Sequence, residues 1–143
     1  MSETTQIHPE KILAYLATDF RLGQTDQDIV LTIGKRSKRL ADLLADSGVH
    51  CGAFLTGFNP QGEIQSNEAN ELAHAQLGVQ LNALGLKTIE GFGSEEGNEW
   101  PAEKSYFAFG MPLESAKAIG THFDQDAIVW VGPDSVPQLI LLR

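Results

Sequence analysis

Apolar residues recur every three or four positions in four stretches of the chain, and this spacing predicts three or four helices. The stretches cover residues 8–17, 37–48, 66–84 and 112–123. The stripes that we expect to face the core are Ile12, Leu13 and Leu16; Leu40, Leu43 and Leu44; Ala69, Ala73, Leu77, Leu81 and Leu84; and Leu113, Ala116, Gly120 and Phe123. Ser37 is a suitable N-cap, and Gly85 suits the left-handed position past a helix end.

Shorter runs rich in β-branched and aromatic residues predict about six strands. They cover residues 29–33, 50–56, 86–90, 104–109, 127–131 and 139–142, with a further short candidate at 19–22. Residues 29–33 are nearly all apolar, as expected for a strand covered on both faces. The order strand, helix, strand over residues 29–56 favours a parallel pair with a right-handed crossover, although the short connection leaves an antiparallel arrangement open.

These elements together predict an α+β fold, a single-domain sandwich in which three or four helices pack on a mixed sheet of about six strands. Residues 23–26 are expected to form a turn, and the glycines within Gly91–Glu99 indicate a loop. The length of 143 residues and the 42% hydrophobic content fit one globular domain over residues 1–143, with residues 1–7 expected to be disordered.

Charge and cysteine content narrow the classes of function. The net charge of −9 argues against nucleic acid and against an anionic membrane surface, since both attract clustered Lys and Arg. The basic run Lys35–Arg39 fits a solvated helix start. The single Cys51 cannot form an intramolecular disulfide and is expected to pack as a small hydrophobe. The first residues lack the pattern of a signal peptide and no apolar run is long enough to span a bilayer, so we expect a cytoplasmic location.

The most function-like feature is Thr56-Gly57-Phe58-Asn59-Pro60, at the end of the strand 50–56. In the functional interpretation, Thr56, Asn59 and Asn70 present donors and acceptors to a small polar ligand, with Phe58 as an apolar wall. In the structural interpretation, Asn59 bonds the turn backbone and Pro60 fixes its geometry. The sequence leaves both interpretations open.

Trp100, Glu103 and Ser105 form a second candidate constellation. The glycine-bearing segment before Trp100 has the composition of a closing lid. Glu103 beside an aromatic ring is a candidate general acid or base with a raised pKa. The structural alternative is that Trp100 fills the core edge and that Glu103 caps a helix or pairs with a lysine. If the strand and the loop converge, Glu103 and Asn59 face one cleft, but the sequence alone does not place them.

Four sequence blocks resemble a known family. They are Ile33-Gly34 before the helix Leu40–Leu44; Ala53–Pro60; Ser66–Asn70; and Trp100–Ser105, followed by Gln125–Ile128. In this order they resemble small bacterial proteins grouped as domain of unknown function 3293. The chain has Phe58 where that family usually has Trp, and Ala69 separates Glu68 from Asn70 where the family has an adjacent Glu-Asn pair. The resemblance implies no catalytic role for any residue.

The sequence therefore predicts a small protein that binds a small polar ligand near Thr56–Pro60, and it leaves open whether that site is catalytic. The alternative is an acidic, non-catalytic interaction module whose residues Glu95, Glu96 and Glu99 bind a basic partner surface. The four histidines lack a metal-ligand spacing, and the glycines lack that of a nucleotide-binding loop, so we expect no metal or other cofactor. The oligomeric state is left open.

Overall fold

The computed structural model describes residues 5–23, 29–95 and 103–143, which form an α+β fold. The helices are α1 (Pro9–Leu16), α2 (Lys38–Asp46), α3 (Asn67–Ala83) and α4 (Leu113–His122), and a 3₁₀ turn, η1, covers Pro60–Gly62. The strands are β1 (Thr18–Leu22), β2 (Ile29–Leu31), β3 (Gly52–Leu55), β4 (Thr88–Glu95), β5 (Glu103–Phe109), β6 (Ala127–Val131) and β7 (Pro137–Leu141). Most of the predicted turn at residues 23–26 lies outside the described residues.

The sheet corrects the predicted architecture. Its seven strands have the order β2-β1-β4-β5-β3-β6-β7, and all six pairings among the described residues are antiparallel. The expectation of a mixed sheet of about six strands was therefore wrong. The parallel pair favoured for residues 29–56 does not form, because three strands separate β2 from β3.

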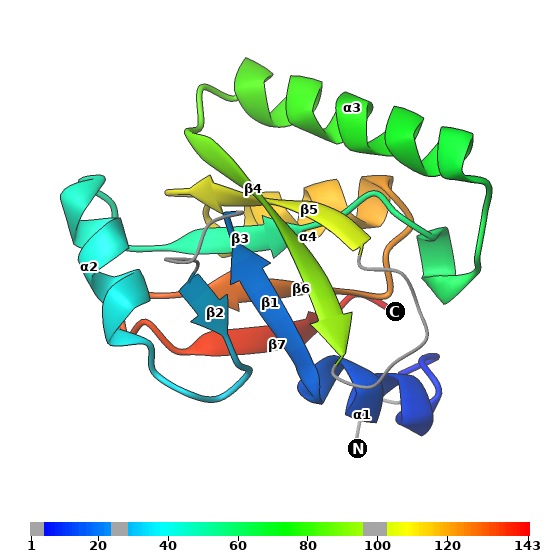
Figure 1. The fold of residues 1–143 in the computed structure, drawn as a ribbon, viewed down its shortest axis with the longest axis horizontal. Coiled ribbons are helices and arrows are strands. Elements are labelled where there is room, and N and C mark those ends of the chain that lie inside the picture. The colour runs from blue at the N-terminus through cyan, green and yellow to red at the C-terminus, as the bar shows by residue number, and fades with distance from the viewer. Residues whose placement is uncertain (1–4, 24–28, 96–102) are drawn as a thin grey trace.

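The sheet is also curled, so it is a half-barrel where a sandwich was expected. The chain just after β2, at one edge, bonds to the chain at the start of β7, at the other edge. Gly34 N–H donates to the Pro137 carbonyl at 2.8 Å, and Ser37 N–H donates to the Ser135 carbonyl at 3.2 Å. Figure 1 shows β2 and β7 close together on the same side of the molecule. The curl brings the two edges together at one end of the sheet.

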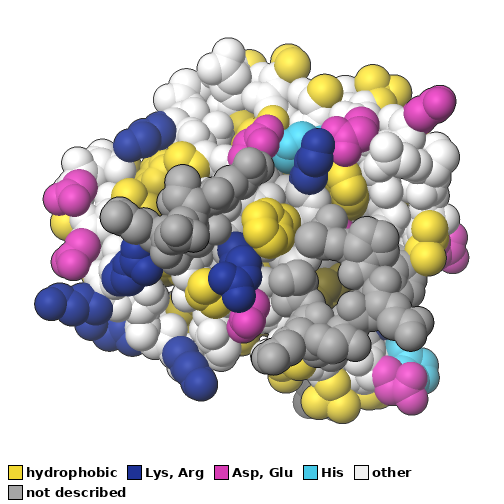
Figure 2. Space-filling view, in the orientation of Figure 1, with side chains coloured by type: hydrophobic (Ala, Val, Ile, Leu, Met, Phe, Trp, Pro, Cys, Tyr) yellow, Lys and Arg dark blue, Asp and Glu magenta, His cyan; other side chains and the backbone are white. Residues whose placement is uncertain are grey.

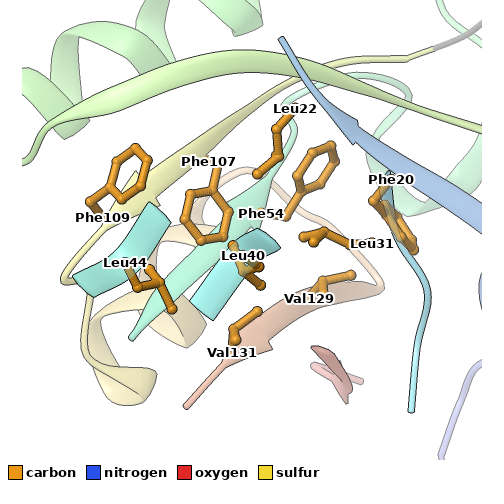
Figure 3. Close-up of a cluster of buried hydrophobic side chains, with 10 residues drawn as sticks. All are labelled: Phe20, Leu22, Leu31, Leu40, Leu44, Phe54, Phe107, Phe109, Val129 and Val131. Atoms are coloured by element: carbon orange, nitrogen blue, oxygen red, sulfur yellow. The ribbon is translucent and has the colours of Figure 1, made fainter. Parts of the chain in front are cut away.

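Two hydrophobic clusters fill the two faces of the sheet, because successive strand residues point to opposite sides. In β3, Phe54 points to the cluster beneath α2, while Ala53 and Leu55 point to the cluster beneath α3 and α4. Figure 3 shows the first cluster, in which side chains from five strands and α2 point toward one another. Its members are Phe20, Leu22, Leu31, Leu40, Leu44, Phe54, Phe107, Phe109, Val129 and Val131. Helices thus cover both faces of β3.

The N-cap predictions hold where the side chain bonds the first turn. Ser37 accepts from Leu40 N–H and Ser66 accepts from Ala69 N–H, both at 3.1 Å, so α2 and α3 begin as expected. The stripe of the second helix, with Leu40 and Leu44 buried and Leu43 half-buried, also faces the core.

Other predictions about burial were wrong. Leu13 is 64% exposed and α1 buries none of its own residues. In α3 the buried residues are Asn70, His74, Leu77 and Leu81. Of the predicted stripe, Leu77 and Leu81 are buried and Ala69 and Ala73 are half-buried, whereas Leu84 is 55% exposed. Ile7, in the segment expected to be disordered, is 4% exposed.

The predicted loop Gly91–Glu99 is wrong over its first half, since β4 continues to Glu95; residues 96–99 lie outside the described residues. The glycine at 91 has a packing role. A Cβ atom there would lie 2.1 Å from the Arg21 carbonyl oxygen on the neighbouring strand β1. Gly91 therefore permits close contact between two strands and does not mark a turn.

Candidate functional site

The chain leaves β3 in a strained turn that packs tightly on α3. Asn59 has φ 46° and Gln61 has φ 56°, both in the left-handed region that non-glycine residues rarely adopt. A Cβ atom at Gly57 would lie 3.1 Å from both the Cβ and the carbonyl oxygen of Ala73, so glycine lets the turn approach the helix. Such strain persists only where surrounding contacts hold it.

Asn59 is held by Asn70 and Gln65 through interlocking amides. Its backbone N–H donates to Asn70 Oδ1 at 2.9 Å, and its Oδ1 accepts from Asn70 Nδ2 at 3.0 Å and from Gln65 N–H at 3.2 Å. Gln65 Nε2 donates to Asn70 Oδ1 at 2.7 Å. Asn59, Asn70 and Gln65, together with Glu103, form what we call the Asn59 site. Asn59 bonds the turn backbone, as the structural interpretation expects, and it also orients polar side chains; its role toward a ligand stays a prediction.

Glu103, the first residue of β5, joins this site, so the turn and the start of β5 converge. Asn59 Nδ2 donates to Glu103 Oε2 at 2.8 Å. Burial raises the pKa of the Glu103 carboxyl above its ordinary value of 4.5, and the hydrogen bond from Asn59 opposes this by lowering the pKa. The structural alternative of a lysine pair is not realised with the neighbouring residue, since Lys104 Nζ contacts Glu71 Oε1 at 2.9 Å.

The other predicted ligand contacts already have partners within the fold. Thr56 Oγ1 donates to the Lys104 carbonyl at 2.7 Å and accepts from Phe58 N–H at 3.0 Å. Ser105 is buried, and its hydroxyl donates to the Glu103 carbonyl at 3.2 Å. Phe58 is buried, and its ring lies perpendicular to that of His74, with centroids 6.1 Å apart. These side chains shape the turn and the start of β5, and Trp100 lies outside the described residues.

A group of charged residues next to the Asn59 site was not predicted. Asp126, just before β6, is 1% exposed and accepts from Arg143 Nη1 at 2.6 Å; Lys11 Nζ lies 3.4 Å from its other oxygen. The pKa of the Tyr15 phenol is raised, mainly by burial and then by the nearby charges of Asp126 and Glu103. We call Lys11, Tyr15, Asp126 and Arg143 the charged cluster. The spacing of Lys11 and Tyr15, four residues apart on one helix, could have indicated a shared face.

A second unpredicted group surrounds His74 on α3. Its ring stacks on Tyr106 with centroids 4.3 Å apart, and its Nε2 lies 3.3 Å from Glu90 Oε1. His74 is 5% exposed, and within the described part of the chain its Nδ1 is a buried atom without a hydrogen-bond partner. Figure 2 shows acidic, histidine and basic side chains side by side along the lower edge of α3. Because His74 follows Asn70 by four residues, both lie on the same helix face.

The described residues contain no group of three or more His, Cys, Asp and Glu side chains arranged to hold a metal ion. Cys51 is a half-buried free thiol whose pKa is raised by burial, and its Sγ contacts the Met111 carbonyl at 3.3 Å. Within the described ranges, none of the helices has both the length and the hydropathy of a membrane span.

Comparison with known proteins identified a family whose model covers both the turn and Glu103. Comparisons with curated proteins and with solved structures each gave no match. A family model described as "Protein of unknown function (DUF3293)" matches residues 55–128, just over half of the 143-residue chain. The matched segment contains every residue of the Asn59 site, together with Asp126. The chain therefore belongs to the DUF3293 family.

Proposed function

We propose that the protein binds a small polar ligand at the Asn59 site, with Glu103 as the main contact. The observation that carries this proposal is the bond from the Asn59 amide to the Glu103 carboxylate at the end of a strained turn. Asn70 and Gln65 hold Asn59 in place, and Asn59 in turn orients Glu103. A site pre-organised in this way loses little conformational entropy when a ligand binds.

The environment of Glu103 supports a functional role. Burial disfavours its charged form, and the only hydrogen-bond donor that contacts it among the described side chains is a neutral amide. A carboxyl required only for structure would gain more from a cation. Carboxyls whose pKa is raised in this way are frequent at binding and catalytic sites. Glu103 is suited to accept a hydrogen bond from a ligand hydroxyl or amine.

A thermal-shift screen tests the proposal. Neutral and charged polar metabolites are compared on the wild type, on Glu103→Gln, and on Glu71→Gln as a surface control that removes the pair with Lys104. We expect a ligand whose stabilising shift is retained in Glu71→Gln, while Glu103→Gln weakens its affinity by about tenfold, the value of one charge-assisted hydrogen bond. A screen in which no compound stabilises the wild type, or in which Glu103→Gln keeps full affinity, contradicts the proposal.

The alternative of an acidic interaction module depends on Glu95, Glu96 and Glu99. Glu96 and Glu99 and the side chain of Glu95 lie outside the described residues. No contact among the described residues favours this second function, so we argue only the first.

A further inference from the structure

The charged cluster combines two cations with one carboxylate. Arg143 Nη1 donates to Asp126 Oδ1 at 2.6 Å, which is a short charge-assisted bond. Lys11 Nζ lies further away, 3.4 Å from Asp126 Oδ2, and donates at 2.8 Å to the Gln61 carbonyl. The cluster therefore contains more positive charge than the buried carboxylate of Asp126 neutralises.

Both cations keep donors that a ligand can reach. The side chains of Lys11 and Arg143 are 44% and 32% exposed, whereas that of Asp126 is 1% exposed. An ammonium has three N–H donors and a guanidinium has five. Two donors of Lys11 and one of Arg143 are engaged in the contacts described above. The buried Asp126 thus orients the two cations, and the exposed parts of their side chains remain accessible to a ligand.

The cluster adjoins the Asn59 site. Gln61, whose carbonyl holds Lys11, lies in the same left-handed turn as Asn59, two residues further on. The charges of Asp126, Glu103 and Arg143 all act on the Tyr15 phenol, so Tyr15 lies near both groups. Figure 1 shows α1, η1, the start of β5 and the C-terminal end gathered at the same end of the sheet. The two groups are therefore neighbours around the same turn.

We propose that Lys11, Arg143 and Tyr15 bind the anionic group, a carboxylate or a phosphate, of a small ligand whose hydroxyl or amine is bound by Glu103. This inference rests on the proposed function of the Asn59 site and adds the chemical class of its ligand. Lys11 and Arg143 supply charge-assisted hydrogen bonds, and the Tyr15 phenol, which stays protonated, supplies a neutral donor. The ligand is a small anion with a donor at its other end.

A polymeric anion does not fit the same surface. Nucleic acid needs many cations to displace its counterions, whereas the cluster contains two. The chain as a whole has a net charge of −9 and repels a long polyanion. A ligand with one anionic group matches the small number of cations in the cluster.

Titrations followed by amide NMR test the ligand class with three probes. Glycerol 3-phosphate and glycolate each combine an anionic group with a hydroxyl, and glycerol is the neutral match. We expect both anions to shift the signals of Lys11, Tyr15 and Gln61, and glycerol to bind at least about tenfold more weakly, as the loss of charge-assisted bonds requires. Equal binding of glycerol and glycerol 3-phosphate overturns the inference.

Variants separate the charged cluster from the Asn59 site. Lys11→Gln and Tyr15→Phe should each weaken anion binding by about three- to tenfold, whereas Lys117→Gln, which removes a surface cation paired with Glu114, should not. Tyr15→Phe keeps the ring, so it remains informative if Lys11→Gln unfolds. Anion binding that none of the cluster variants weakens overturns the inference.

The two proposals fail in different ways. If a neutral ligand from the thermal-shift screen depends on Glu103 while neither anion binds, the proposed function stands and the ligand class is wrong. If the anions bind through Lys11 and Arg143 but Glu103→Gln keeps full affinity, the anion site stands and the proposed function is wrong.

Discussion

At the scale of single residues, Asn59 is the residue on which the site depends. Its left-handed backbone would cost about 1–2 kcal/mol for a residue with no compensating contacts. Its side chain offsets this cost by bonding Asn70, Gln65 and Glu103 at the same time. The position therefore needs both an unusual backbone conformation and an amide.

Replacing Asn59 separates these two requirements. Asn59→Ala loses the amide and keeps the strained backbone, so we expect it to lower the free energy of unfolding by about 2–4 kcal/mol. Asn59→Gly loses the amide but relieves the strain, and should be less destabilised by up to about 1 kcal/mol. Urea denaturation measures both values. An alanine variant as stable as the wild type would show that the network contributes nothing.

Glu103 makes stability depend on pH. Because burial raises its pKa in the folded chain above the ordinary 4.5, the folded state holds the proton more tightly than the unfolded state. The contribution of Glu103 to the free energy of unfolding is fully present below its unfolded pKa, and it is lost as the pH rises through its folded pKa. Glu103→Gln, which cannot ionise, should therefore gain stability relative to the wild type as the pH rises from about 4 through the folded pKa.

The titration of the Glu103 carboxyl carbon, followed by NMR, measures the same shift directly. We expect its pKa to lie above 4.5 and to rise further in Asn59→Ala, since the hydrogen bond that lowers it is lost. A value at or below 4.5 in the wild type contradicts this prediction.

At the scale of elements, β4 shows why a glycine can be misinterpreted. Gly91 and Gly93 have the same composition signal, yet only Gly91 has a backbone atom of β1 within 2.1 Å of the position of its missing Cβ; at Gly93 the nearest atom is 3.5 Å away. Sequence composition cannot distinguish the two, because the difference arises from a strand distant along the chain. The continuation of β4 was missed for this reason.

Two alanine substitutions on β4 test this explanation. Gly91→Ala should lower the free energy of unfolding by about 3 kcal/mol or more, because the added methyl group forces β1 and β4 apart. Gly93→Ala, which meets atoms only at ordinary contact distances, should cost less than about 1 kcal/mol. Thermal unfolding compares them, and equal melting temperatures would remove the packing explanation.

The sequence predicted features that depend on neighbouring residues, and it missed those that depend on residues far apart in the chain. Ser37 and Ser66 were identified as helix starts because a cap bonds its own first turn. Asn59 and Glu103 were each singled out for their side-chain chemistry, but the sequence did not place them together; their 2.8 Å contact comes from the tertiary fold. The neighbours Lys11 and Arg143 were missed because only the tertiary fold brings both ends of the chain to Asp126.

At the scale of the whole molecule, Asp126 joins the two ends of the described chain. Arg143 bonds its carboxylate, Lys11 approaches the same group from α1, and Thr5 Oγ1 donates to the Arg143 carbonyl. The buried carboxylate is stable only while a cation compensates it. Its ion pairs thus differ from the exposed pair Lys117–Glu114 on α4.

Removing the charge of Arg143 should therefore destabilise the fold more than removing the charge of Lys117. We expect Arg143→Gln to lower the free energy of unfolding by about 1–3 kcal/mol, discounted for its partial exposure, and Lys117→Gln to change it by less than about 0.5 kcal/mol. Chemical denaturation of both variants provides the comparison. Equal losses would mean that Asp126 does not depend on Arg143.

The sheet order has a consequence for how the chain reaches this structure. Three of the six pairings join strands that are not consecutive, and Phe54 on β3 pairs with Val129 on β6. Such long-range pairings slow folding to milliseconds or seconds, because a large loop must close before contacts form. During synthesis, β3 gains its second neighbour only after residues 127–131 have emerged. The emerging chain therefore exposes an edge of β3 until its last strands are made, and this is the stage at which it is most open to aggregation.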